Sequence, residues 1–258
     1  METIAANWYD FPTVYDVAFG WDTTPEIDFL IDLFRRLAPG PIRSIYEPFS
    51  GSGRLAIPLA QRGYQVLGVE YNRCMLKRAI QRASTSQANV AFQHADVTTW
   101  RCHPPVDAIV TLIDSFRHLI APADIDAALQ CFRASLRPAG LLIIGLTVGE
   151  PVSGQDAWTA ERDGLTVQTT VIDTGLPGPT PSSTLMHSRF DITEPTGRQY
   201  AVECREPMRR YHLAELLALL TAAGFEPLET WTWRNVPQRV TESDLSDSVV
   251  IVARSAPA

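Results

Sequence analysis

The feature that most constrains the fold of this chain is a glycine-containing turn that follows a short β-prone segment, residues 44–46. The turn has the sequence Glu-Pro-Phe-Ser-Gly-Ser-Gly-Arg, from Glu47 to Arg54. Gly51 and Gly53 let the backbone turn tightly and approach a ligand, because they carry no Cβ. From Arg54 the apolar positions follow helical spacing, so the turn predicts the start of a helix whose free N–H groups face the ligand.

A carboxylate, Glu70, closes the next apolar run, Val66-Leu67-Gly68-Val69. At this position of a βαβ unit a carboxylate can accept hydrogen bonds from both hydroxyls of a ribose. The turn, the helix and Glu70 together predict a nucleotide-cofactor site. Two cofactor classes fit, because the run from Gly51 to Ala56 also has the G-x-G-x-x-A form of dinucleotide-binding proteins.

The acid at position 47 separates the two classes. A pyrophosphate requires a helix N-terminus free of negative charge, whereas the methionine end of S-adenosylmethionine (SAM) carries an ammonium and a sulfonium that favour a carboxylate. Glu47, Gly51 and Gly53 resemble the first motif, acid-x-Gly-x-Gly-x-Gly, of the class I SAM-dependent methyltransferases, in their small-molecule, methyltransferase-25-like form. Phe49 stands where that motif has its first glycine.

The resemblance implies a role for each matched residue. Glu47 would bind the methionine ammonium, Glu70 the ribose, and Asp96, which follows the third strand, the adenine amino group. Asp96 taken alone fits equally well a residue that caps a turn. The expected cofactor-binding residues are Glu47, Phe49, Gly51, Gly53, Glu70, Tyr71, Asp96, Val97, Ile113 and Tyr15.

The candidate catalytic residues follow the fourth strand, in the run from Asp114 to His118. The resemblance places the floor between cofactor and substrate here. His118 could act as a general base because the pKa of histidine lies near neutral pH, although a lone histidine is more often structural. Asp114 is the second candidate. The run lacks the Pro-Pro pair of DNA amino-methyltransferases, which argues against base methylation.

The fold class follows from the alternation of strand and helix patterns up to residue 148. We expect helices at 25–37, 54–62, 73–82, 123–135 and 213–223, and strands at 42–46, 64–69, 90–92, 108–113, 141–146, 225–233 and 248–253. The last two strands are joined without a helix, so they must pair antiparallel. The sequence predicts an α/β fold: a doubly wound, Rossmann-like, seven-stranded sheet with a reversed last strand.

The span from 149 to 209 breaks this alternation. It contains three β-like runs, at 165–172, 183–191 and 199–205, the first two separated by a loop at 175–181 that is too rich in Gly and Pro for a strand. We expect an inserted antiparallel β lid that walls a substrate pocket beside Asp114, His118 and Tyr15. The expected division is an arm at 1–24, a SAM-binding domain at 25–148 and 210–258, and the insertion at 149–209.

Two further groups of residues have competing interpretations. Aromatic residues crowd the first 21 positions, and we expect Tyr9 and Tyr15 to reach the cofactor or substrate; simple packing of an arm is the alternative. The cluster at 206–212 is polar and arginine-rich. We interpret it as an exposed helix terminus, and a cluster that closes the pocket on a carboxylate-bearing substrate is the alternative.

Composition excludes several classes of partner. The net charge is −7 and no basic run occurs, so nucleic acid is not expected as a partner. Neither a signal-peptide pattern nor a stretch of about 18 apolar residues is present, which predicts a cytoplasmic protein without a membrane partner. The four cysteines lack a C-x-x-C pair and histidines at zinc spacing, so we expect reduced thiols and no metal site.

The sequence therefore predicts SAM-dependent methyl transfer to an O or N atom of a small molecule, by a monomer or homodimer. Two alternatives stay open. An NAD-dependent oxidoreductase uses a similar glycine loop, although Glu47 and the final strand pair argue against it. The second alternative is a non-catalytic SAM-binding protein, since a fold does not by itself prove an activity.

Overall fold

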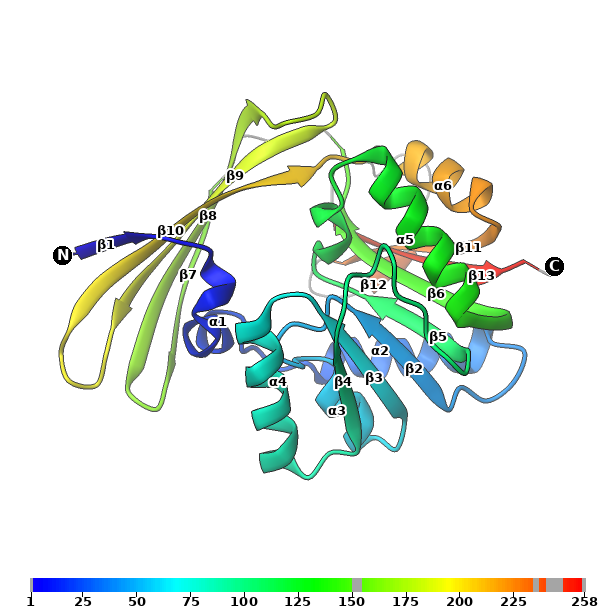
Figure 1. Cartoon of the computed structure of the whole chain (residues 1–258), viewed down its shortest axis with the longest axis horizontal. Helices are drawn as coiled ribbons and strands as arrows, with labels where there is room; N and C mark the ends of the chain where they lie inside the picture. Colours follow the sequence, from blue (N-terminus) through cyan, green and yellow to red (C-terminus); the bar gives the residue numbers. More distant parts are fainter. Residues whose placement is uncertain (1, 150–154, 234–236, 240–247, 257–258) are drawn as a thin grey trace.

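A computed structural model describes residues 2–149, 155–233, 237–239 and 248–256. Figure 1 shows two lobes. The larger lobe contains a mixed sheet with helices on both faces, and the smaller lobe contains a twisted antiparallel sheet. The N-terminal segment runs along the smaller sheet and then lies against helix α4 (Arg73–Ser86) of the larger lobe.

The sheet of the larger lobe has the strand order β12-β11-β13-β6-β5-β2-β3-β4. Strands β4, β3, β2, β5 and β6 run parallel, and β13 is antiparallel to both of its long neighbours, β6 and β11. The predicted seven-stranded sheet with a reversed last strand is confirmed, and the three-residue strand β12 adds an eighth. The strands are β2 (Ser44–Pro48), β3 (Gln65–Glu70), β4 (Val90–His94), β5 (Val106–Thr111), β6 (Leu136–Thr147), β11 (Phe225–Trp233), β12 (Pro237–Arg239) and β13 (Ser248–Ser255).

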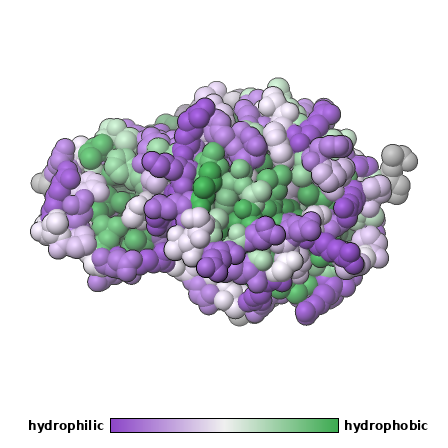
Figure 2. Space-filling view, turned by 60° about the horizontal axis from the view of Figure 1, so that its bottom comes forward, coloured by the Kyte–Doolittle hydropathy of each residue, from purple (hydrophilic) through white to green (hydrophobic). Residues whose placement is uncertain are grey.

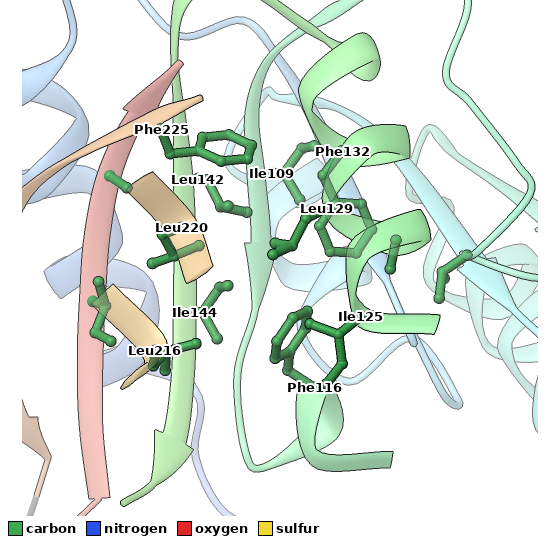
Figure 3. Packing of buried hydrophobic residues seen from close by; sticks show 14 of the residues in the cluster. Ile109, Phe116, Ile125, Leu129, Phe132, Leu142, Ile144, Leu216, Leu220 and Phe225 are labelled. Carbon is green, nitrogen blue, oxygen red and sulfur yellow. The ribbon is translucent and has the colours of Figure 1, made fainter. Parts of the chain in front are cut away.

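Each face of this sheet is covered by helices that carry apolar residues at helical spacing. Helices α5 (Pro122–Ser135) and α6 (Leu213–Ala222) cover one face, where Phe132 and Leu220 pack on Ile144 and its neighbours (Figure 3). Helices α2 (Thr24–Leu37) and α3 (Ala56–Gln61) cover the other, with Leu30 and Leu59 fully buried. Burying a leucine side chain stabilises by roughly 1.5–3 kcal/mol, so these two cores hold the strand ends in place.

The smaller sheet has the order β1-β10-β9-β8-β7. Its strands are β1 (Glu2–Ala5), β7 (Gln155–Arg162), β8 (Leu165–Pro177), β9 (Ser183–Thr193) and β10 (Gln199–Arg209). The predicted antiparallel insertion is confirmed as an additional sheet. Strands β7 and β1 were not predicted, and β1 pairs parallel with β10, which is separated from it by most of the chain.

One local prediction was wrong. Strand β8 continues to Pro177, so the first part of the predicted loop at 175–181 belongs to a strand; a register shift between Asp173 and Pro177 accommodates Gly175. The N-terminal arm, for which no helix or strand was predicted, is folded. It forms a one-turn helix, η1 (Trp8–Asp10), and the helix α1 (Pro12–Ala18), because its aromatic residues form a third core with the smaller sheet.

Figure 2 shows hydrophilic side chains over much of one face, with apolar residues gathered on both lobes. In the described part of the chain, no helix is long and apolar enough to cross a bilayer.

Candidate functional site

The glycine turn joins β2 to α3 and contains three residues in the left-handed region of backbone space. These are Phe49 at φ 57°, Gly51 at 55° and Gly53 at 78°. Glycine adopts this region freely, whereas an aromatic residue there is strained by roughly 1–2 kcal/mol. Phe49 therefore keeps the backbone conformation of the glycine that it replaces in the motif. Strain of this kind gathers at functional sites.

Gly51 and Gly53 have different neighbours. A Cβ on Gly53 would lie 2.8 Å from Cζ of Phe92 on β4, so this glycine lets the turn pack against the sheet. A Cβ on Gly51 would meet only the end of the flexible Met75 side chain, at 3.4 Å. Of the two, Gly51 lines the large cavity described below and Gly53 does not.

Glu70 is the last residue of β3, and its carboxylate accepts hydrogen bonds from two backbone segments. Its Oε2 accepts a hydrogen bond from the N–H of Gly51 at 2.8 Å, and its Oε1 accepts one from the N–H of Asn72 at 2.6 Å. Burial raises the pKa of Glu70, and these N–H groups partly offset that rise. The carboxylate thus connects the glycine turn to α4, whose N-cap is Asn72.

Asp96 lies just beyond β4 and caps a turn. Its Oδ1 accepts hydrogen bonds from the N–H of Thr98 at 2.9 Å and from the Thr98 hydroxyl at 2.7 Å. Asp96 also lines the large cavity beside Val97. The turn-capping interpretation is therefore correct, and it leaves the second carboxylate oxygen available to a ligand.

Glu47 lies near the end of β2 and is only 7% exposed. Its Oε2 has no hydrogen-bond partner in the described part of the chain. Burial raises the pKa of Glu47 to about 8, a shift that Arg54 partly opposes. A buried carboxylate without a partner is costly. A cationic ligand group would supply the missing partner.

A cavity of about 760 Å³ lies at the carboxyl ends of β2, β3 and β4. Ten predicted site residues line it: Tyr9, Tyr15, Phe49, Gly51, Glu70, Tyr71, Asp96, Val97, Ile113 and His118. Glu47, Gly53 and Asp114 are not among its lining residues. The cavity is large enough for a nucleoside cofactor and part of a small acceptor.

Asp114 lies outside the lining of the large cavity. Its Oδ1 accepts from the N–H of Thr147 at 2.6 Å, and its Oδ2 accepts from the Thr147 hydroxyl and from Arg117. It borders a smaller cavity, of about 240 Å³, with Ile113 and Trp21. Since these contacts join the end of β5 to β6, Asp114 holds the two strand ends together. This structural role replaces the predicted catalytic one.

His118 meets two residues that come from distant parts of the chain. It lies in the short helix η2 (Ser115–His118), and its Nε2 is 3.0 Å from the hydroxyl of Tyr9 in the arm. Its Nδ1 is 3.8 Å from Oε2 of Glu206 on β10. Burial lowers the pKa of His118 to about 4 and raises that of Glu206 to about 7. The imidazole is therefore neutral at pH 7 while Glu206 is close to half ionised.

The interpretation of the cluster at 206–212 as an exposed helix terminus was wrong for its main members. The Glu206 side chain is 16% exposed and lines the cavity, Arg209 is buried, and Tyr211 is fully buried. The alternation of apolar residues along β10 is the sequence signal for this burial. The strand continues to Arg209, and its alternation places Glu206 on the same inward face as Tyr200, Val202 and Cys204.

The cysteines agree with the expectation of free thiols: Cys74 is exposed and Cys102, Cys131 and Cys204 are buried and unpaired. Among the described residues, no group of three metal-binding side chains lies close enough to hold an ion.

Comparison with known proteins agrees with this geometry. Residues 45–140, which span the glycine turn, Glu70 and Asp96, match the family model of a methyltransferase domain. This part of the chain is similar to a methyltransferase domain. The chain is 31% identical over 144 residues to the glycine/sarcosine N-methyltransferase of Parasynechococcus marenigrum (strain WH8102), a match that covers 52% of this chain and 48% of the relative. The chain thus spans about half the length of that relative.

Two solved structures share the fold over nearly their whole length. DesVI of Streptomyces venezuelae superposes with a TM-score of 0.79 at 21% identity, over 96% of this chain and 98% of DesVI. The SAM-bound amino pentose methyltransferase of Micromonospora echinaspora superposes with a TM-score of 0.72 at 20% identity, over 99% of this chain and 100% of the other. These likenesses confirm the fold, including the additional sheet.

Proposed function

We propose that this protein transfers the methyl group of SAM to an amine or hydroxyl of a small molecule in the cytoplasm. The observation that carries the proposal is the 760 Å³ cavity, which has two chemically different walls. One wall is formed by the glycine turn and by the carboxylates at the ends of β3 and β4. The other is formed by Tyr9, His118 and Glu206, which come from the arm, η2 and β10.

The first wall fits SAM. The sulfonium of bound SAM supplies a methyl group that is already electrophilic, so the protein has mainly to orient the reactants and exclude water. Glu70 and Asp96 each have carboxylate oxygens at the cavity for the ribose and the adenine amino group. Glu47 does not line this wall, but its buried, unpartnered oxygen would suit the methionine ammonium. Gly51 lets the backbone come close to the ligand.

The second wall fits an acceptor that must lose a proton. Glu206 can take up a proton near neutral pH, and the neutral imidazole of His118 can exchange protons with it and with the Tyr9 hydroxyl. Two further carboxylates, Asp10 and Asp124, line the same cavity. This acidic lining favours a cationic amine. An amine acceptor also agrees with two of the similar proteins, a glycine/sarcosine N-methyltransferase and an amino pentose methyltransferase.

Ligand binding tests the cofactor half of the proposal. SAM or its demethylated product, at one hundred times the dissociation constant, should raise the free energy of unfolding by about 2.7 kcal/mol, which is measured as a shift in melting temperature. NAD and NADP should produce no shift. A shift with NAD but none with SAM would overturn the proposal. Binding of SAM without turnover of any amine or alcohol would favour the non-catalytic SAM-binding protein.

The substitution Glu206→Gln tests the acceptor half. It removes the proton acceptor but keeps the size of the side chain, so we expect kcat to fall by about 100-fold with an unchanged Kd for SAM. Below pH 7 the wild-type rate should also fall as Glu206 becomes protonated. Glu203→Gln is the matched control, because Glu203 lies on the same strand but pairs with Arg189 on the opposite face of the sheet. Equal activity of both variants would remove Glu206 from the mechanism.

A further inference from the structure

A buried carboxylate of the N-terminal arm contacts the glycine turn at a residue that does not line the large cavity. Asp16 lies in α1 and is 6% exposed. Its Oδ1 accepts a hydrogen bond from the hydroxyl of Ser52, the residue between the two glycines. The arm therefore touches the turn at its central residue.

Two arginines of α4 complete the contact. Arg78 donates from Nε to Oδ2 of Asp16 at 2.6 Å, and Arg82 donates from Nη1 to Oδ1 at 3.0 Å. Arg82 also donates to the carbonyl oxygen of Ser52 at 3.1 Å and to its hydroxyl oxygen at 2.9 Å. One carboxylate thus joins three segments that are remote in sequence: the arm, the glycine turn and α4.

The same network borders the cavity through adjacent residues. Tyr15 precedes Asp16 in α1, and Gly51 precedes Ser52 in the turn; both line the cavity. Figure 1 shows α1 between α4 and the smaller sheet, where Trp158 donates to the carbonyl oxygen of Ala18. A shift of α1 would therefore move Tyr15 and at the same time break the contact between Asp16 and the glycine turn.

We propose that Asp16 is a positioning residue for the cofactor: through Ser52, Arg78 and Arg82 it holds the glycine turn and Tyr15 in the arrangement that binds SAM. This inference rests on the proposed function. Asp16 contacts Ser52 and does not line the cavity, so it would act on the cofactor without touching it. Displacing packed groups at a site by even 1 Å is enough to weaken binding strongly.

The variants Asp16→Asn and Ser52→Ala test this role. Asp16→Asn removes the charge that both arginines bind. Ser52→Ala removes only the hydroxyl and keeps the ion pairs, so it tests the contact even where Asp16→Asn fails to fold. We expect Kd and KM for SAM to rise about tenfold in the first variant and severalfold in the second. At saturating SAM, kcat and KM for the acceptor should stay near wild type.

Asp28→Asn is the control. Asp28 pairs with Arg62 on the exposed surface of the larger lobe, so its loss should leave KM for SAM unchanged. A purely structural role for Asp16 would lower the melting temperature of its variant without changing Kd for SAM, and that result would overturn the inference. Failure of the wild-type protein to bind SAM would instead overturn the proposed function, so the two failures are distinguishable.

Discussion

At the scale of single residues, the surroundings of Glu47 give it chemistry that a surface glutamate lacks. The ordinary pKa of 4.5 rises to about 8 because the side chain is buried. At pH values between these two pKa values, Glu47 is therefore protonated in the folded state and ionised in the unfolded state. By linkage, the free energy of unfolding contributed by Glu47 is fully present below pH 4.5 and is lost as the pH rises toward 8.

The variant Glu47→Gln should remove this dependence, because glutamine resembles the protonated form and cannot ionise. Between pH 5 and pH 8 the wild type should lose on the order of 3 kcal/mol more stability than the variant, measured by urea denaturation at several pH values. The SAM ammonium would favour the ionised carboxylate, so only the wild type should bind SAM more tightly as the pH approaches 8. Parallel stability curves for the two proteins would contradict the assignment.

At the scale of elements, Asn72 connects the start of α4 to the arm. Its Oδ1 accepts hydrogen bonds from the N–H groups of Cys74 and Met75, and its Nδ2 donates to Oδ1 of Asp10 at 2.9 Å. The N-cap therefore has two partners of different kinds: the helix itself and the segment that covers the cavity.

Two substitutions separate these partners. Asn72→Ala should lower the free energy of unfolding by about 1 kcal/mol, the usual contribution of an N-cap. Asn72→Ser keeps a capping oxygen but is too short to reach Asp10, so it should lose much less stability. Urea denaturation measures both. If the serine variant lost as much stability as the alanine variant, the contact with Asp10 rather than the cap would account for the loss.

At the scale of the whole molecule, the large cavity is lined by residues of both lobes and of the arm that connects them. Cofactor binding should therefore slow amide hydrogen exchange in residues 7–16 of the arm as well as in the glycine turn, 49–53, and in 70–75. Strand β7, the outer edge of the smaller sheet, should be unaffected. Mass spectrometry with and without SAM measures this pattern. Protection confined to the larger lobe would show that the arm takes no part in binding.

The sequence by itself determined the class of fold and indicated the residues that we propose to bind the cofactor. Strand and helix periodicity, the glycines of the turn and the carboxylates at strand ends are local signals. Parallel strands bring their carboxyl ends to one edge, so Glu70 and Asp96 were placed together by topology alone. Glu47 was recognised from its charge beside the turn, and the reversed last strand from a connection without a helix.

Only the tertiary structure decided which residues form the second wall of the large cavity. Tyr9 and His118 are 109 positions apart, and Asp16 and Ser52 are 36 apart, so no local period relates them. They meet because β1 adds to β10 and because the aromatic residues of the arm pack on the smaller sheet. The same packing buries Glu206, which looks in the sequence like part of an exposed polar cluster. Burial then sets its pKa near 7, because desolvation disfavours the charged form.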